Sequence, residues 1–306
     1  MFVDEVLNVE KSLNDIFKNH NYTKNPTLID LINRGYVYPK LEQHKVLFVG
    51  MNPSYIDGSK PYDHINYKIQ DAVTAYPKHY GNFQKIATNC GLGTNWSYMD
   101  LFYFRETDQK KVDSLISDVE GIDFVCKQLK LSFSMIENLK PDLIVVCNSG
   151  GRKFFGLDKQ LHGVKTTNVW LGYNFEFNDK FGVDVITGIH EDSLIDGDKH
   201  THLIGTPILF SSTLTYMDAS SKKRLEWQVK QILKYHTLFF GSESILSHRS
   251  IPIANQLKVL TERIKEIELL KKSLLSKNKH EEVARIRDGE LDELEKIIEL
   301  LMKIEN

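Results

Sequence analysis

KVLFVGMNPS, residues 45–54, is the stretch of the sequence that decides the fold class. Residues 46–49 form a short, continuous apolar run, which Gly50 and Pro53 bring to an end. Such a run is typical of a parallel strand that is buried on both faces, and glycine and proline favour the turn that follows it. We therefore expect a buried strand that feeds a loop at residues 50–54.

Two later stretches show the same order of a buried strand followed by a polar loop. Residues 143–147 are apolar and lead into Asn148, and residues 207–210 lead through a polar segment, 211–215, into a helix expected at about 220–235. The helix before residue 143 has apolar side chains on one face: Val125, Leu129, Phe133, Ile136 and Leu139. This order predicts an α/β fold, a three-layer sandwich around a central and mostly parallel sheet, with a cleft at the carboxyl ends of the strands.

The segments around these units are expected to be helical at both ends of the chain. Apolar spacing predicts an N-terminal helical segment, residues 1–40, packed on the core of an α/β domain that spans residues 41–245. Residues 250–306 carry heptad-spaced leucines and isoleucines, which predict a helical hairpin or coiled coil. Between the second and third strands we expect a hairpin at residues 167–177 and a loop at residues 190–202.

Composition indicates an ordinary globular chain and limits its partners. Its 306 residues include 39 Lys and Arg against 41 Asp and Glu, so the net charge of −2 provides no overall basic field, and any DNA contact requires a local basic patch. Cys90, Cys126 and Cys147 lie far apart and predict neither a metal site nor a disulfide framework. The N-terminus lacks a signal-peptide pattern, and no apolar run reaches the roughly 18 residues of a membrane span. We expect a cytoplasmic protein.

The first loop also carries a family resemblance. Gly50-Met51-Asn52-Pro53-Ser54 resembles the first motif of the uracil-DNA glycosylase superfamily, closest to its mismatch-specific and single-strand-selective branches. Residues 81–92 and 98–102 are similar to the helix and strand that follow that motif, and the resemblance covers roughly residues 40–235. It implies a base-flipping enzyme that hydrolyses the N-glycosidic bond of uracil or another modified base in DNA without a cofactor.

The resemblance assigns roles to the residues of the first motif. Asn52 would orient the attacking water through its amide carbonyl, which suffices when the transition state carries its own positive charge. Tyr62, His64 and Tyr67 are candidates for the aromatic side chain that stacks on the base. The substrate-binding candidates are Gly50, Met51, Pro53, Ser54, Tyr62, His64 and Asn148. The turn at residues 148–151 is open to two interpretations, an anion-binding nest or the start of a helix.

The family's second motif, a His-Pro-Ser or Asn-Pro-Ser segment, corresponds to residues 210–215. Ser212 would contact a phosphate, and Leu214 would fill the gap that a flipped base leaves. The DNA-binding candidates are thus Ser211, Ser212, Thr213 and Leu214. Phe210 occupies the position of the histidine or asparagine that stabilises the departing base, and the proline is absent. This difference motivates the hypothesis of a modified base that leaves easily.

Two further patterns are open to more than one interpretation. His190, His200 and His202 lie among acidic residues, but their spacing fits no compact metal site, so we favour a solvated loop from which one histidine could replace the missing motif histidine. Residues 279–288 resemble the UVR motif, a helical hairpin that pairs with a like hairpin. The C-terminal helices would then bind a protein partner or self-associate, although their charges also fit a solvated coiled-coil face.

Taken together, these patterns favour a DNA base glycosylase, with a role in base-excision repair or in the restriction of modified DNA. The alternative from another class is a non-catalytic protein that binds DNA lesions or a partner through a glycosylase-like domain. A third possibility is an enzyme of free nucleosides or nucleotides, which would lack the salt-dependent binding that phosphate contacts confer.

Overall fold

The computed structural model describes residues 2–18, 20–56, 58, 66–162, 165–195 and 199–239, together with the single positions 269 and 273. Contacts divide the chain into two compact units, residues 1–236 and 237–306. The helical hairpin predicted at residues 250–306, with its UVR-like segment, lies outside the described residues apart from those two positions. The first unit contains the elements discussed below, apart from the last residues of α9 (Ala219–Phe239).

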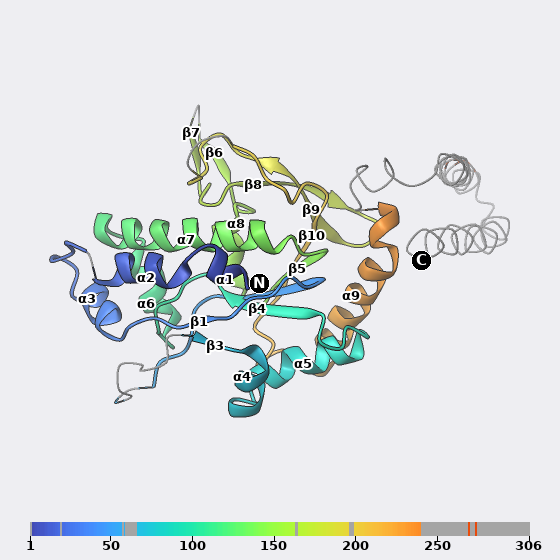
Figure 1. Ribbon diagram of the computed structural model, residues 1–306. Helices are drawn as coiled ribbons and strands as arrows, with labels where there is room; N and C mark the ends of the chain where they lie inside the picture. Colours follow the sequence, from blue (N-terminus) through green and yellow to red (C-terminus); the bar gives the residue numbers. More distant parts are fainter. Residues whose placement is uncertain are drawn as a thin grey trace. The chain divides into compact units, whose positions relative to one another are not determined.

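The first unit combines helices and strands, which Figure 1 labels. The helices are α1 (Val3–Val6), α2 (Val9–Lys18), α3 (Pro26–Asn33), α4 (Ile69–Ala75), α5 (Tyr80–Asn89), α6 (Gln109–Leu115), α7 (Val119–Leu139), η1 (Ser149–Gly151), α8 (Arg152–Phe155) and α9 (Ala219–Phe239). The strands are β1 (Tyr38–Pro39), β2 (Val46–Gly50), β3 (Asn66–Tyr67), β4 (Trp96–Asp100), β5 (Leu143–Val146), β6 (Gln160–His162), β7 (Lys165–Thr167), β8 (Tyr173–Asn178), β9 (Val183–Ile189) and β10 (Pro207–Phe210). Among the described residues, no helix has the length and apolar character that a membrane crossing requires.

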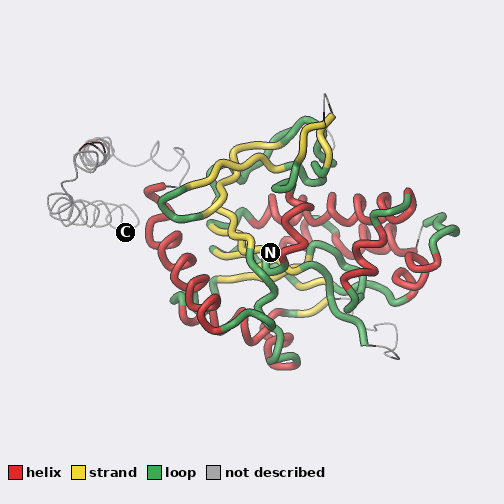
Figure 2. Tube along the Cα trace, turned by 180° about the vertical axis from the view of Figure 1, so that it is seen from behind, coloured by secondary structure: helices red, strands yellow, loops and turns green. Residues whose placement is uncertain are grey.

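The central sheet has six strands in the order β4-β2-β5-β10-β9-β8. The first four are parallel, with Phe48 of β2 beside Tyr98 of β4 and Val145 of β5. The last two, β9 and β8, are antiparallel and extend the sheet as a hairpin, which Figure 2 shows from behind. The predicted α/β class with a central, mostly parallel sheet is therefore confirmed, and the carboxyl ends of β4, β2, β5 and β10 lie at one edge.

Helices cover both faces of this sheet, with α2 and α7 on one side and α4 and α5 on the other (Figure 1). Every residue of β2 is buried, as expected of a strand that packs on both faces. Leu47 and Val49 belong to the larger apolar core, which α2 and α7 share. Phe48 points the other way and meets Phe83 of α5, with 5.5 Å between ring centroids. The alternation of side chains along β2 thus places Gly50 on the face toward α5.

The prediction of a hairpin at residues 167–177 is wrong. The hairpin of the central sheet is β8–β9, which begins at Tyr173. Asn168, Trp170 and Gly172 have φ values of 55°, 49° and 75°, so the chain turns sharply there and cannot run as a strand. Polar and apolar residues alternate in β8, which leaves it half-buried and weakens its sequence signal.

The chain beyond the end of β4 pairs with the segment that follows α3. Tyr36 forms an antiparallel bridge with Phe104, and Val37 N donates a hydrogen bond to Tyr103 O at 3.1 Å. Further along, β1 pairs with β3 in a separate two-stranded sheet. The strand-like continuation of β4 is therefore paired on its outer side.

Candidate functional site

β2 ends at Gly50, where the structure has no room for a side chain. An ideal Cβ at this residue would lie 2.2 Å from Asp100 Oδ1 and 2.2 Å from Tyr98 Oη. Both side chains belong to β4, and the Tyr98 hydroxyl donates a hydrogen bond to Asp100 Oδ1 at 2.7 Å. Since Gly50 is not among the residues with positive φ, its role is to allow this close approach.

Asp100 combines full burial with an unusual ionisation. Burial raises the pKa of its carboxyl to about 7, even though the hydrogen bond from Tyr98 favours the charged form. Burial also raises the pKa of Tyr98 well above its ordinary value, so the phenol remains a donor. Asp100 is only 3% exposed, so it supports the end of β2 from within the protein.

Asp100→Asn should change the pH dependence of stability. Between about pH 4 and pH 7 the native carboxyl holds a proton that the unfolded chain releases, so the free energy of unfolding falls by up to about 1.4 kcal/mol per pH unit. An amide does not ionise, so the free energy of unfolding of the variant should not show this decline. Relative to the native protein, the variant should therefore become more stable as the pH rises. Urea unfolding at about pH 5 and about pH 8 measures the difference. Parallel pH profiles for the two proteins would contradict it.

The amide of Asn52 has a fixed orientation. Its Nδ2 donates to Glu106 O at 2.6 Å and to Pro53 O at 3.1 Å. Because both neighbours are acceptors, the nitrogen must face them and Oδ1 must face the opposite way. There Gln109 Nε2 donates to Oδ1 at 3.1 Å. The carbonyl that the family resemblance assigns to water binding therefore points toward an exposed side chain of α6.

The segment after β4 holds this loop in place. Glu106 N donates to Pro53 O at 2.9 Å, and the Glu106 carboxylate accepts hydrogen bonds from Thr107 N and Asp108 N. The same carboxylate lies 2.7 Å from Arg34 Nη1, in an ion pair whose side chains are 9% and 5% exposed. Burial alone would raise the pKa of Glu106, but these hydrogen bonds outweigh it and lower the pKa. Glu106 is therefore a buried anion at neutral pH.

Tyr55 provides a second connection between the two loops. Its N–H donates to Thr107 Oγ1 at 3.0 Å, and the Thr107 hydroxyl donates to Tyr55 O at 2.6 Å. The guanidinium carbons of Arg34 and Arg105 lie 4.2 Å and 5.2 Å from the centroid of the Tyr55 ring. Tyr55 is thus a half-buried aromatic residue of the first loop, stabilised by two cations, that the sequence interpretation missed.

Met51 and Asn148 connect the loops after β2 and β5. Met51 is 6% exposed, and its Cε lies 3.1 Å from the position that a Cβ at Gly150 would take. Asn148 Oδ1 accepts a hydrogen bond from Gly150 N at 2.9 Å and caps the short helix η1. Of the two interpretations of this turn, the geometry favours the helix start. Ser54 is exposed on the far side of Pro53.

The loop after β10 lies at the same edge of the sheet. Ser211 N donates to Val146 O at 2.8 Å, Ser212 is exposed, and Thr213 is half-buried. Leu214 is fully buried, so it does not project from the loop as the predicted DNA wedge would. The protruding apolar side chain of this loop is Tyr216, which is 89% exposed.

Phe210 belongs to the packing of the core. Its ring lies 5.9 Å from that of Phe155 and 6.0 Å from that of Phe175. At the position where the family has a histidine or asparagine, this chain therefore has an apolar contact with α8 and β8. For the reaction that the resemblance implies, the group that stabilises the departing base would have to come from another element.

A histidine does reach this loop, and it comes from the start of α5. His79 Nδ1 lies 3.3 Å from Thr215 Oγ1, and the ring packs edge-on against Tyr98, the residue beside Gly50. Burial lowers the pKa of His79, so the imidazole is neutral at neutral pH. His79 lies between the two motifs in the sequence, where no local pattern marks it.

Of the three aromatic side chains that were candidates for stacking on the base, the structure describes one, Tyr67. Tyr62 and His64 lie outside the described residues. Tyr67 is half-buried, and its hydroxyl lies 3.0 Å from that of Tyr80 at the start of α5. It is therefore part of the packing around α5.

The three histidines of the 190–202 segment lie at the opposite edge of the sheet. Because β9 is antiparallel and Val185 pairs with Pro207, the end of β9 runs past the amino end of β10. His190 follows there and donates from its backbone N to Gly172 O at 2.7 Å, and the rings of His200 and His202 lie 5.2 Å apart. The expectation that one of them replaces the motif histidine is therefore wrong. Within the described part of the chain, no group of three or more His, Cys, Asp or Glu residues could hold a metal ion.

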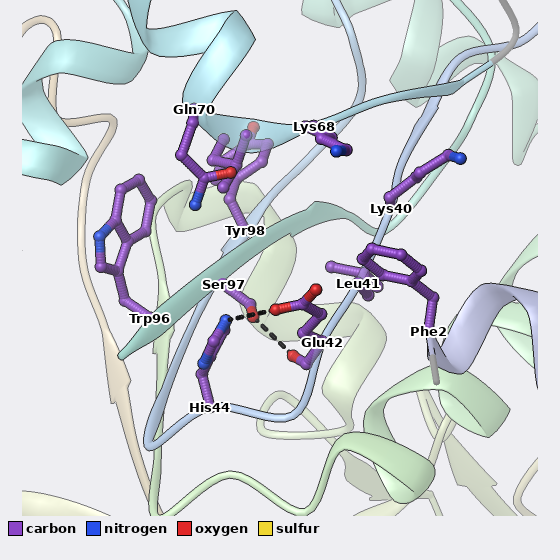
Figure 3. Close-up of a pocket in the computed structure, with 11 residues that line it drawn as sticks. Phe2, Lys40, Leu41, Glu42, His44, Lys68, Gln70, Trp96, Ser97 and Tyr98 are labelled. Carbon is purple, nitrogen blue, oxygen red and sulfur yellow. Dashed lines mark hydrogen bonds and ion pairs between the residues drawn. The ribbon is translucent and has the colours of Figure 1, made fainter. Parts of the chain in front are cut away.

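A hollow of about 170 Å³ opens beside β4, and Asn52 is not among the residues that line it (Figure 3). Phe2, Lys40, Lys68 and Trp96 line it, and Glu42 O accepts a hydrogen bond from Ser97 Oγ at 2.9 Å at its wall. The surrounding residues come from the early part of β4, from segments that precede the first motif, and from the start of α4. We place the functional site at the carboxyl edge because the polar loops meet there.

Comparisons of the sequence with known proteins give no match for this chain. No model of a known protein family matches the chain, and no curated protein matches its sequence. The functional interpretation therefore depends on the residues of the site.

Proposed function

We propose that this protein hydrolyses N-glycosidic bonds in DNA and removes uracil or another modified base. The observation that carries this proposal is the Asn52 amide, which two backbone acceptors hold with its carbonyl directed away from them. It lies after a buried parallel strand, at the edge where α/β proteins bind their ligands. The resemblance of residues 50–54 to the first glycosylase motif supports the same reaction.

The proposed reaction asks little of a general base. The bond between C1′ and the base nitrogen breaks, the base leaves with the bonding electrons, and the sugar becomes positively charged. A neutral amide carbonyl then needs only to accept a hydrogen bond from water and to direct the water oxygen toward C1′. Neutral His79, beside Thr215, is our candidate for a hydrogen bond to the departing base, the role that Phe210 leaves open.

DNA would bind along the loop after β10 and the start of α9. The loop presents the hydroxyl of Ser212 and the exposed ring of Tyr216, and α9 begins with Lys222, Lys223 and Arg224. Lysine and arginine contact phosphates without reading sequence, whereas an exposed aromatic ring can stack on a base. Because the net charge of the chain is −2, DNA binding requires a local basic patch, and these three basic residues would supply it. A protein partner of residues 250–306 stays a prediction.

Asn52→Ala tests the catalytic assignment. We expect the single-turnover rate of abasic-site formation to fall by about a hundredfold or more, the usual effect of removing one polar group aligned with a transition state. The rate is measured with an oligonucleotide that carries one uracil, followed by cleavage with alkali. DNA binding, measured by fluorescence anisotropy, should change little. Asn138→Ala is the matched control, because Asn138 is an exposed asparagine that also donates to a backbone carbonyl.

The rival function is a non-catalytic protein that binds altered DNA. One observation favours it: the Asn52 amide makes all three of its hydrogen bonds within the protein, as a purely structural residue would. Under this function the native protein binds uracil-containing or otherwise modified DNA but yields no abasic sites on any of these substrates. The same alkali assay, run across a panel of modified bases, separates the two functions.

A further inference from the structure

Gln109 is the side chain that meets the outward-facing carbonyl of Asn52. It is the first residue of α6 and is exposed, and its Nε2 donates to Asn52 Oδ1 at 3.1 Å. Among the contacts of the described residues, this is the one side-chain hydrogen bond of Gln109. Its own amide oxygen is therefore available as an acceptor, as is the second lone pair of Asn52 Oδ1.

The backbone beneath Gln109 is held as firmly as the Asn52 loop. Asp108 caps α6 by accepting a hydrogen bond from Lys110 N at 3.0 Å. Asp108 N in turn donates to the buried carboxylate of Glu106, the residue whose backbone carbonyl fixes Asn52. One short segment thus sets the positions of both amides.

We propose that Gln109 is a second catalytic residue, which binds the attacking water together with Asn52; this inference rests on the proposed function. The two amides are joined by the hydrogen bond from Gln109 Nε2 to Asn52 Oδ1. A water molecule that bridges them can donate one hydrogen to each amide oxygen, which leaves a lone pair of the water oxygen directed outward. After the base has left, that oxygen forms the new bond to C1′ of the positively charged sugar. The base takes the electron pair of the broken bond, and one water proton ends on the base, so that neither amide has to gain a proton.

A purely structural role for Gln109 predicts a different outcome. If Gln109 only blocked the carbonyl of Asn52, its removal would free an acceptor and raise the rate. If it only held the loop, its removal would lower the melting temperature together with the rate. The water-binding role predicts a lower rate with unchanged stability, because the single bond it makes lies at the exposed surface.

Gln109→Met tests these outcomes, because methionine keeps the length of the side chain and removes both amide groups. We expect the single-turnover rate on the uracil oligonucleotide to fall about tenfold or more, while anisotropy shows unchanged DNA binding and the melting temperature stays within about a degree of the native value. Gln84→Met, a substitution of an exposed glutamine in α5, is the matched control and should leave the rate unchanged.

The results separate this inference from the proposed function. An unchanged or higher rate in Gln109→Met, with the native protein active and Asn52→Ala impaired, overturns the role of Gln109 alone. A native protein that forms no abasic sites on any modified DNA overturns both. A fall in the rate that matches a fall in the melting temperature or in DNA binding shows a structural residue and also overturns the proposal.

Discussion

Gly50→Ala is expected to lower the free energy of unfolding by about 4 kcal/mol, since forcing a methyl group into a packed core and breaking a buried hydrogen bond each cost about 1–3 kcal/mol. The added methyl group would lie 2.2 Å from both Asp100 Oδ1 and Tyr98 Oη, and neither buried side chain has space to move without leaving the other. Thermal unfolding followed by circular dichroism should show a fall in melting temperature of about 10 °C.

A control and a rescue make the cause specific. At Gly81 in α5 the nearest atom to an added Cβ is 3.9 Å away, so Gly81→Ala should be neutral or slightly stabilising. Adding Tyr98→Phe and Asp100→Ala to Gly50→Ala removes both crowded oxygens. The triple variant should therefore lose less stability than the sum of the losses measured for the three single variants. Additive losses would show that the contact with β4 is not the reason for glycine at this position.

Arg34→Gln is expected to destabilise the protein by about 3–5 kcal/mol, because it removes the buried cation of the Glu106 ion pair and leaves only the half-exposed Lys111 beside the carboxylate. Arg34 and Glu106 are 9% and 5% exposed, and Arg34 also lies against the ring of Tyr55. The variant should therefore lose catalytic rate as well as stability, since Glu106 positions Asn52. Urea unfolding and the single-turnover assay measure the two losses.

The control for Arg34→Gln shares the same carboxylate. Lys111 Nζ lies 3.4 Å from Glu106, but the lysine side chain is 46% exposed, so Lys111→Ala should cost less than about 1 kcal/mol. Because the native pKa of Glu106 is lowered, the pair stabilises the protein above the ordinary range of a glutamate, and this stabilisation is lost as the pH falls through the native pKa. A stability loss in Arg34→Gln that is equally large in acid would contradict this account.

Three of the four parallel strands could be predicted from the sequence because their side chains are almost continuously apolar and buried. Residues 46–49, 143–147 and 207–210 are continuous apolar runs ended by turn residues, and β2, β5 and β10 occupy those positions. The β8–β9 hairpin lies at the edge of the sheet, where half-burial mixes polar residues into the strands. The predicted hairpin at residues 167–177 was wrong because the strands on the two sides of the turn in that segment pair elsewhere, β7 with β6 and β8 with β9.

The residues of the candidate site, too, could be predicted only in part. Asn52 could be predicted because its motif is contiguous, whereas its partners come from separate elements. Arg34 and Glu106 are 72 residues apart, and His79 is 136 residues from Thr215. No local pattern reports such contacts, since they depend on how the loops meet after folding. Leu214 shows the reverse error, because its place in a polar loop suggested exposure while the structure buries it.

The pairing of Tyr36 and Val37 along the continuation of β4 has a consequence for the behaviour of the chain in solution. Residues 101–104 are four consecutive apolar or aromatic residues that are fully buried, directly beyond an edge strand. An uncovered run of this kind is a template for pairing between molecules and hence for aggregation. In the folded protein, the segment after α3 occupies part of this template through the pairing of Tyr36 and Val37.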